Sequence, residues 1–145
     1  MKNLHHLLDK SYLKIKFKVS KTQHLLIKAK INGVLGNFIL DTGASNSCVG
    51  FSNVSKFNLT TSKSKTKVAG AGSIGMETLI SKKNKIQLGK WKTTDFKIII
   101  FDLYHVNHSL EAQKAKPIDG IIGADVLLNG HGIIDYFNKC LYLKR

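Results

Sequence analysis

The chain of 145 residues contains little arginine, proline, cysteine or acid. It has one arginine, one proline, two cysteines and nine acidic residues, against 22 lysines. A single proline and the absence of any low-complexity stretch leave no linker at which to divide the chain. We therefore predict one domain, 1–145, with a flexible arm at 1–11. No apolar run reaches the roughly 18 residues of a membrane-spanning helix, so no membrane span is expected.

The spacing of the cysteines and histidines does not indicate a metal site, and we expect neither a metal nor another cofactor. Cys48 and Cys140 have no partners at metal-ligand spacing, so we predict two buried free thiols. His105 and His108 lack a third ligand and lie in an expected loop that runs to Pro117. The N-terminal segment has no apolar stretch long enough for a signal peptide, which favours a cytoplasmic protein.

The scarcity of acidic residues leaves a net charge of +14. Such a charge attracts nucleic acid, an anionic membrane surface or an acidic substrate. The charge is almost all lysine, however, whereas arginine makes the bidentate contacts that read bases. The lysines are spread along expected strands and do not cluster. We interpret them mainly as a solvated face, with sequence-independent affinity for polyanions as the weaker alternative, and expect no specific nucleic-acid partner.

Alternation of apolar and polar residues predicts a chain of short strands. In the first, 12–19, Leu13, Ile15, Phe17 and Val19 face one side and lysines the other. The strands 25–31 and 34–40 flank Asn32-Gly33, a strong hairpin signal. Further strands are expected at 47–51, at 82–89 with Ile86 and Leu88 inward, and at 96–101, 133–136 and 140–143. A helix is expected at 124–128, and residues 52–64 fit either a loop or a helical turn.

The most informative sequence is FILDTGAS at residues 38–45. Three apolar residues suit the end of a buried strand, and Gly43 suits a tight turn directly after it. A carboxylate in that position needs hydrogen-bond donors, which Thr42 and the backbone amides of Gly43 and Ala44 can supply. Two interpretations remain open on this motif alone. Asp41 either caps its own turn or is presented there for chemistry.

A second sequence, DGIIGADVL at residues 119–127, decides between them. Together the two motifs resemble those of aspartic proteases. Their separation of about 80 residues is similar to that in the single-domain, retropepsin-like branch, closer to its cellular and bacterial members. The resemblance covers roughly residues 25–143. It implies an all-β, closed, barrel-like acid-protease fold, which is half of a pepsin-like architecture, with one short helix in the C-terminal region.

The resemblance also implies an activity, namely hydrolysis of peptide bonds in an extended substrate by an aspartic endopeptidase. The site residues then fall into three groups. Asp41, Thr42 and Gly43 are catalytic; Ala44, Ser45, Gly70, Ala71, Gly72 and Ser73 bind substrate; Ile121, Ile122 and Gly123 form the structural second motif.

The glycine-rich sequence AGAGSIG at residues 69–75 is expected to be the tip of a mobile hairpin. Glycines give the backbone freedom and little bulk, so such a tip can close over a ligand. In the family that it resembles, this element is the flap. A plain surface hairpin is the alternative. A phosphate-binding loop is disfavoured because no Lys-Ser/Thr pair or helix start follows it.

Peptide hydrolysis by this chemistry requires two carboxylates that share one proton. The chain has one Asp-Thr-Gly, and Asp119, Asp125 and Asp135 do not form a second. We therefore expect a homodimer in which each chain contributes Asp41 across a two-fold axis. Two alternatives remain: a catalytically silent peptide-binding or dimerisation module, and a basic nucleic-acid-associated protein.

Two positions depart from the viral members of the family. Those enzymes carry an acidic residue directly after Asp-Thr-Gly-Ala and often an arginine after the second motif, where this chain has Ser45 and Ala124. Both members of that ion pair are absent together. We therefore expect the chain termini to pair differently from those at the viral dimer interface.

Overall fold

The computed structural model describes residues 11–63 and 78–145. The expected glycine-rich hairpin tip and the expected arm, except Ser11, lie outside these residues. Within them the elements, in chain order, are β1 (Tyr12–Lys16), β2 (Lys18–Val19), β3 (Leu25–Ile31), β4 (Val34–Leu40), β5 (Cys48–Gly50), η2 (Phe51–Asn53), β6 (Ser62–Lys63), β7 (Leu79–Leu88), β8 (Trp91–Phe101), α1 (Tyr104–Ala112), β9 (Gly120–Ile122), α2 (Ala124–Asn129), β10 (Ile133–Asp135) and β11 (Cys140–Lys144).

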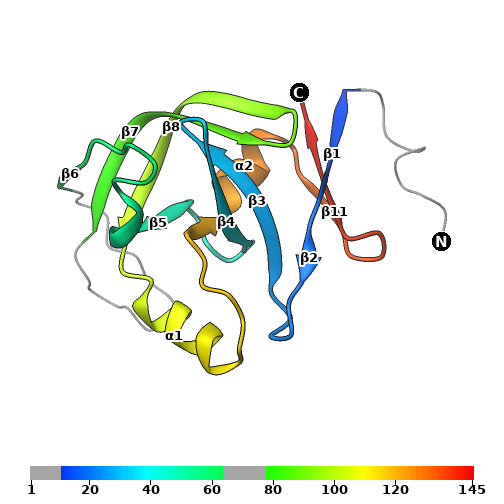
Figure 1. Cartoon of the computed structure of the whole chain (residues 1–145). Coiled ribbons are helices and arrows are strands. Elements are labelled where there is room, and N and C mark those ends of the chain that lie inside the picture. The colour runs from blue at the N-terminus through cyan, green and yellow to red at the C-terminus, as the bar shows by residue number, and fades with distance from the viewer. Residues whose placement is uncertain (1–10, 64–77) are drawn as a thin grey trace.

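Six strands form a closed barrel, which confirms the predicted fold class (Figure 1). The strands follow the order β3-β4-β9-β5-β8-β7, and a further pairing of β3 with β7 closes the ring. Most neighbours are antiparallel, but β4 and β9 run parallel, as do β5 and β8. The parallel β4–β9 pair places the ends of the two sequence motifs side by side, and the site is built on that pair.

The hairpin between β3 and β4 shows why this part of the chain folds as its sequence predicts. Asn32 and Gly33 have φ angles of 51° and 83°, the two positive values that a type I′ turn requires. This turn sets a register in which Ile31 pairs with Val34 and Leu25 with Leu40. The bounds of both strands match the prediction.

The interior of the barrel is filled by the inward-facing residues of the same strands. The strand β3 alternates buried apolar residues with lysines, as its sequence indicates. The inward orientation predicted for Ile86 and Leu88 is confirmed, because both are fully buried. The segment left open at 52–64 contains turns that follow η2, and its Phe57 enters the core against Phe38.

A smaller sheet of three strands, in the order β1-β11-β10, pairs the two ends of the described chain with each other. Tyr12 pairs with Lys144, and the N–H of Arg145 donates to the carbonyl of Ser11 at 2.9 Å. The prediction of one strand at 12–19 is therefore wrong in part. The chain leaves the small sheet at Phe17 and joins the barrel sheet as β2, where Val19 is 41% exposed.

The expectation of a loop from His105 to Pro117 is also wrong, because α1 occupies most of it. Leu103, Val106 and Leu110 follow the i, i+3, i+7 spacing of a helix face, and they pack on a second apolar cluster outside the barrel. Asn107 fixes the far end of the segment. Its side chain accepts from the N–H of Ile118 at 2.7 Å and donates to the carbonyl of Ile118 at 3.2 Å.

Candidate active site

The strand β4 delivers Asp41 to the surface at the end of the barrel wall. Its last residues, Phe38, Ile39 and Leu40, are buried and pair with Gly120, Ile121 and Ile122 of β9. The N–H of Asp41 continues this ladder by donating to the carbonyl of Ile122 at 2.9 Å. The backbone at Asp41 is therefore held by the core, while its side chain is exposed.

Of the two backbone amides predicted to donate to the carboxylate, that of Gly43 does so, whereas that of Ala44 donates to the main-chain carbonyl of Asp41. The N–H of Gly43 donates to Oδ1 of Asp41 at 2.8 Å, and the N–H of Ala44 donates to the Asp41 carbonyl at 3.2 Å. Thr42, Gly43 and Ser45 are exposed, and Ala44 is half-buried. The arrangement presents one carboxylate to solvent with Oδ1 already hydrogen-bonded.

The second motif supports this turn from behind, and Ile121 and Ile122 are buried in its strand. The N–H of Ala124 donates to the carbonyl of Ala44 at 2.7 Å. A Cβ on Gly123 would lie 2.4 Å from that same carbonyl oxygen. The approach of the two backbones is thus closer than any side chain at Gly123 would allow, which explains the glycine.

A buried hydrogen-bond network that the sequence does not reveal locks the loop in place. The carboxylate of Asp125 in the first turn of α2 accepts from the Ser47 hydroxyl at 2.7 Å and from the Ser47 N–H at 2.8 Å. The Ser47 hydroxyl in turn accepts from the N–H of Gly123 at 3.0 Å. Ser47 is 2% exposed. These hydrogen bonds hold the C-terminal end of the loop after Asp41 to the second motif.

Replacement of Ser47 by alanine is therefore expected to destabilise the protein. The change leaves a buried N–H of Gly123 and an oxygen of Asp125 without this partner, which costs about 1–3 kcal/mol for such groups. Urea unfolding at one protein concentration measures the difference. Ser52→Ala, at an exposed position, is the matched control and should change stability by less than about 0.5 kcal/mol. Equal stability of the two variants would contradict the network's role.

The cysteine nearest to the catalytic turn does not offer a competing nucleophile. Cys48 is buried, and so is Cys140, which confirms the prediction of two buried free thiols. The pKa of Cys48 is raised to about 12, mainly by burial and to a smaller extent by the nearby carboxylates of Asp125 and Asp41. The thiol stays protonated at neutral pH, whereas the thiolate is the reactive form.

The three other acids near the second motif and the C-terminal sheet are each engaged away from Asp41. Asp119 accepts from the N–H of Asn37 at 2.8 Å and pairs with Lys56 at 3.0 Å. Asp125 serves Ser47, and Asp135 accepts from the side chain of Asn138 at 2.7 Å. None of the three is therefore available as a second catalytic carboxylate. Among the described residues no cluster of three potential metal ligands occurs.

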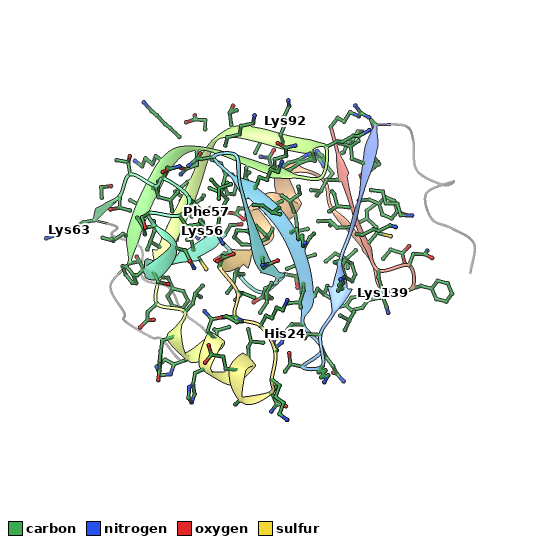
Figure 2. The ribbon with its side chains drawn as sticks, viewed as in Figure 1. His24, Lys56, Phe57, Lys63, Lys92 and Lys139 are labelled. Carbon is green, nitrogen blue, oxygen red and sulfur yellow. The ribbon has the colours of Figure 1, made fainter. Side chains whose placement is uncertain are left out.

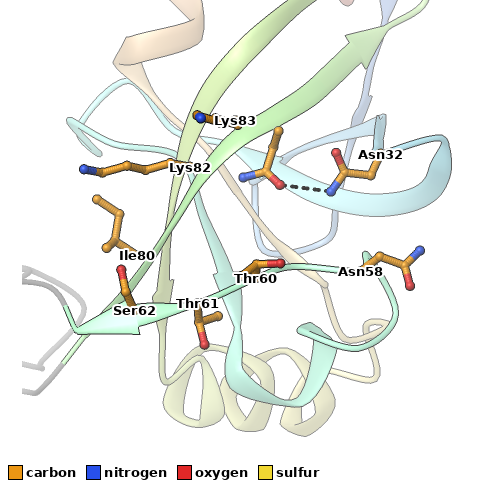
Figure 3. A pocket seen from close by; sticks show the side chains of 9 residues that line it. Asn32, Asn58, Thr60, Thr61, Ser62, Ile80, Lys82 and Lys83 are labelled. Atoms are coloured by element: carbon orange, nitrogen blue, oxygen red, sulfur yellow. Dashed lines mark hydrogen bonds between the residues drawn. The ribbon is translucent and has the colours of Figure 1, made fainter.

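A polar hollow of about 530 Å³ lies elsewhere, at the start of β7 (Figure 3). Apart from Ile80, its lining residues carry amide, hydroxyl or ammonium groups: Asn32, Asn58, Thr60, Thr61, Ser62, Lys82, Lys83 and Asn84. No residue of the catalytic turn is among them. The predicted substrate-binding residues Gly70, Ala71, Gly72 and Ser73 lie outside the described part of the chain.

The comparison with protein families identifies the chain. The family model described as "Aspartyl protease" matches residues 27–126. This segment holds both motifs and most of the barrel. The chain belongs to the aspartyl protease family. Asp41, at the end of β4 beside Ile122, lies within the matched residues.

Solved structures place this aspartyl protease in the retropepsin-like fold. A retropepsin-like aspartic protease from Rickettsia conorii is 18% identical, with 91% of this chain and 87% of that chain covered and a TM-score of 0.60. EIAV protease, complexed with the inhibitor HBY-793, is 18% identical, with 77% of this chain and 91% of that chain covered and a TM-score of 0.55. The retroviral protease-like domain of Ddi1 from Leishmania major is 20% identical, with 83% of this chain and 87% of that chain covered and a TM-score of 0.53.

At these identities the likeness to solved structures shows the fold alone. No curated protein sequence matches this aspartyl protease significantly. In the part of the chain that the structure describes, neither helix is long and apolar enough to cross a membrane.

Proposed function

We propose that the protein is a homodimeric aspartic endopeptidase whose two Asp41 carboxylates meet across a two-fold axis. The observation that carries the proposal is the exposed Asp41 carboxylate on a turn fixed by Gly43 and by the second motif. The other nearby acids are engaged elsewhere, so the second carboxylate that this chemistry needs has to come from another chain. Membership of the aspartyl protease family supports the same reaction.

The reaction follows from the pair of like charges. Two carboxylates a few ångströms apart share one proton, because both cannot ionise easily. The ionised Asp41 acts as general base on a water held between the two, and the protonated Asp41 donates toward the carbonyl of the scissile bond. The water oxygen adds to the carbonyl carbon, the C–N bond breaks, and the leaving nitrogen takes up a proton. No metal is needed.

The residues around Asp41 take supporting roles in this proposal. The hydroxyl of Thr42 ties the two catalytic turns together across the axis. Gly43, Ala44 and Ser45 form the floor on which an extended peptide lies in strand-like conformation. The glycine-rich tip at 70–73 covers the peptide and excludes water.

A dimer requirement predicts that activity depends on protein concentration. On dilution, the specific activity against a fluorogenic peptide at mildly acid to neutral pH should fall as dimers dissociate. Sedimentation velocity at the same concentrations should show the dimer fraction falling in parallel. A monomer that keeps full activity on dilution would contradict the shared site. A stable dimer without any cleavage would instead identify a silent binding module.

A further inference from the structure

The outer surface of the barrel is divided into two halves of opposite character. One half is apolar, with Ile39, Ile99 and Ile121 pointing outward, and α1 covers it. The other half carries exposed lysines on three adjacent strands. These are Lys28 and Lys30 of β3, Lys85 of β7, and Lys92 and Lys97 of β8, together called the lysine wall.

The strand register brings these lysines close together. Lys30 pairs with Gln87 of β7, and Gln87 pairs with Lys92 of β8, so Lys30 and Lys92 stand in one row across three strands. Strands lie about 4.8 Å apart, which puts the backbones of these two residues about 10 Å apart. Lys28 follows on the same face of β3, about 7 Å from Lys30. Figure 2 shows Lys92 projecting from the β7–β8 end of the barrel.

The charge of the lysine wall is not neutralised within the described residues. The single ion pair among them joins Lys56 to Asp119 and involves no lysine of the wall. The strands β3, β7 and β8 carry one acidic residue, Asp95, against seven lysines, of which five belong to the wall. The wall therefore presents exposed positive charge that no ion pair among the described residues compensates.

The composition of the wall distinguishes among polyanions. The exposed large aromatic side chains of the described residues lie off the wall: Phe51 in η2, Tyr104 in α1, and Tyr136 and Phe137 in the turn after β10. Single-stranded nucleic acid is usually held by aromatic stacking, and membrane interfaces by aromatic anchors. The outer face of a closed barrel is also curved, which suits the flat surface of a membrane poorly. Lysine point charges without stacking side chains match the regular phosphates of a duplex.

We propose that the lysine wall binds the phosphate backbone of duplex nucleic acid without reading its sequence. Two more lysines of β7, Lys82 and Lys83, line the polar hollow and precede Lys85 on the same strand. The site does not include Asp41, so this binding is independent of the proposed peptidase reaction. It accounts for the lysine excess that the reaction itself does not require.

The test measures binding of a 20-base-pair duplex of arbitrary sequence by fluorescence anisotropy, as DNA and as RNA, over a series of salt concentrations. Each phosphate neutralised contributes about −0.9 to the slope of log K against log salt for a DNA duplex. We expect the variant Lys28→Gln, Lys30→Gln, Lys92→Gln to bind at least about tenfold more weakly in low salt, with a slope shallower by about 3.

Two further variants make the result specific to the wall. Lys14→Gln, Lys16→Gln, Lys116→Gln removes the same charge from exposed positions off the wall and should weaken binding less than threefold. Lys28→Arg, Lys30→Arg, Lys92→Arg keeps the charge and should keep the affinity. Circular dichroism establishes that all three variants are folded. Equal losses in the two glutamine variants, a flat salt dependence, or wall-dependent binding to phosphatidylglycerol vesicles but to neither duplex would overturn the proposal.

Discussion

Peptide cleavage is expected to fall by a factor of about 10²–10⁴ or more when Asp41 is replaced by asparagine, with the fold and the dimer retained. Asparagine has nearly the shape of aspartate, and its side-chain oxygen can still accept from the N–H of Gly43, which is 2.8 Å from Oδ1 in the native turn. It cannot ionise, so it can serve neither as general base nor as the partner that shares a proton. The loss therefore falls on the chemical step.

The measurement is cleavage of a fluorogenic peptide at mildly acid to neutral pH, with circular dichroism and sedimentation velocity on the same samples. Asp95→Asn is the matched control. Asp95 is exposed and has a φ of 56°, a conformation that asparagine tolerates. That variant should retain wild-type activity. Undiminished cleavage by Asp41→Asn would show that the observed hydrolysis does not use this carboxylate.

Mixing the two forms tests the sharing of the site. When wild-type protein is mixed with an excess of Asp41→Asn, most wild-type chains pair with a variant chain. Such mixed dimers have one carboxylate and one amide, and the shared proton is lost. We expect activity to decline toward the small fraction of wild-type dimers that remains. Activity proportional to the wild-type protein alone would indicate an active monomer.

The parts of the fold that the sequence predicts are those in which local signals agree with each other. The strands β3 and β4 follow from their alternation together with the Asn32-Gly33 turn, and β4 leads directly to Asp41. The helix α2 follows from the apolar run that Asn129-Gly130 ends. In each case the periodicity and the turn residues lie within a few positions of each other.

The parts that the sequence does not reveal depend on residues that are far apart. Ser47 and Asp125 are separated by 78 positions, and nothing near either one indicates their hydrogen bonds. The helix α1 has a narrow apolar face that packs on the outward apolar patch of the barrel. Without knowledge of that patch, the face cannot be recognised as a packing surface. Even there a weak signal existed, because Leu103, Val106 and Leu110 follow helical spacing. Polar residues between them concealed it.

The second large effect is expected at Gly123, where alanine should destabilise the protein by about 3 kcal/mol or more and remove activity. Gly123 has a φ of −109° and a ψ of −165°, which alanine also adopts. The cost is therefore steric. A Cβ would lie 2.4 Å from the carbonyl oxygen of Ala44 and 3.1 Å from the carbonyl carbon of Asn46. Both are backbone atoms of the catalytic loop, so relief requires that loop to move. Overpacking a core costs about 1–3 kcal/mol even where side chains can yield.

Gly50→Ala is the matched control for this steric effect. Gly50 is also buried and has a φ of −69°, but the nearest atom to its Cβ would be a side-chain methyl of Leu103, at 3.4 Å. We expect that variant to lose less than about 1 kcal/mol and to keep its activity. Urea unfolding at one fixed protein concentration, together with the peptide assay, compares the two. A Gly123→Ala protein that is stable but inactive would locate the effect in the displaced Asp41 turn. One that is stable and active would show that the close contact between the two motifs is not needed to hold the carboxylate in place.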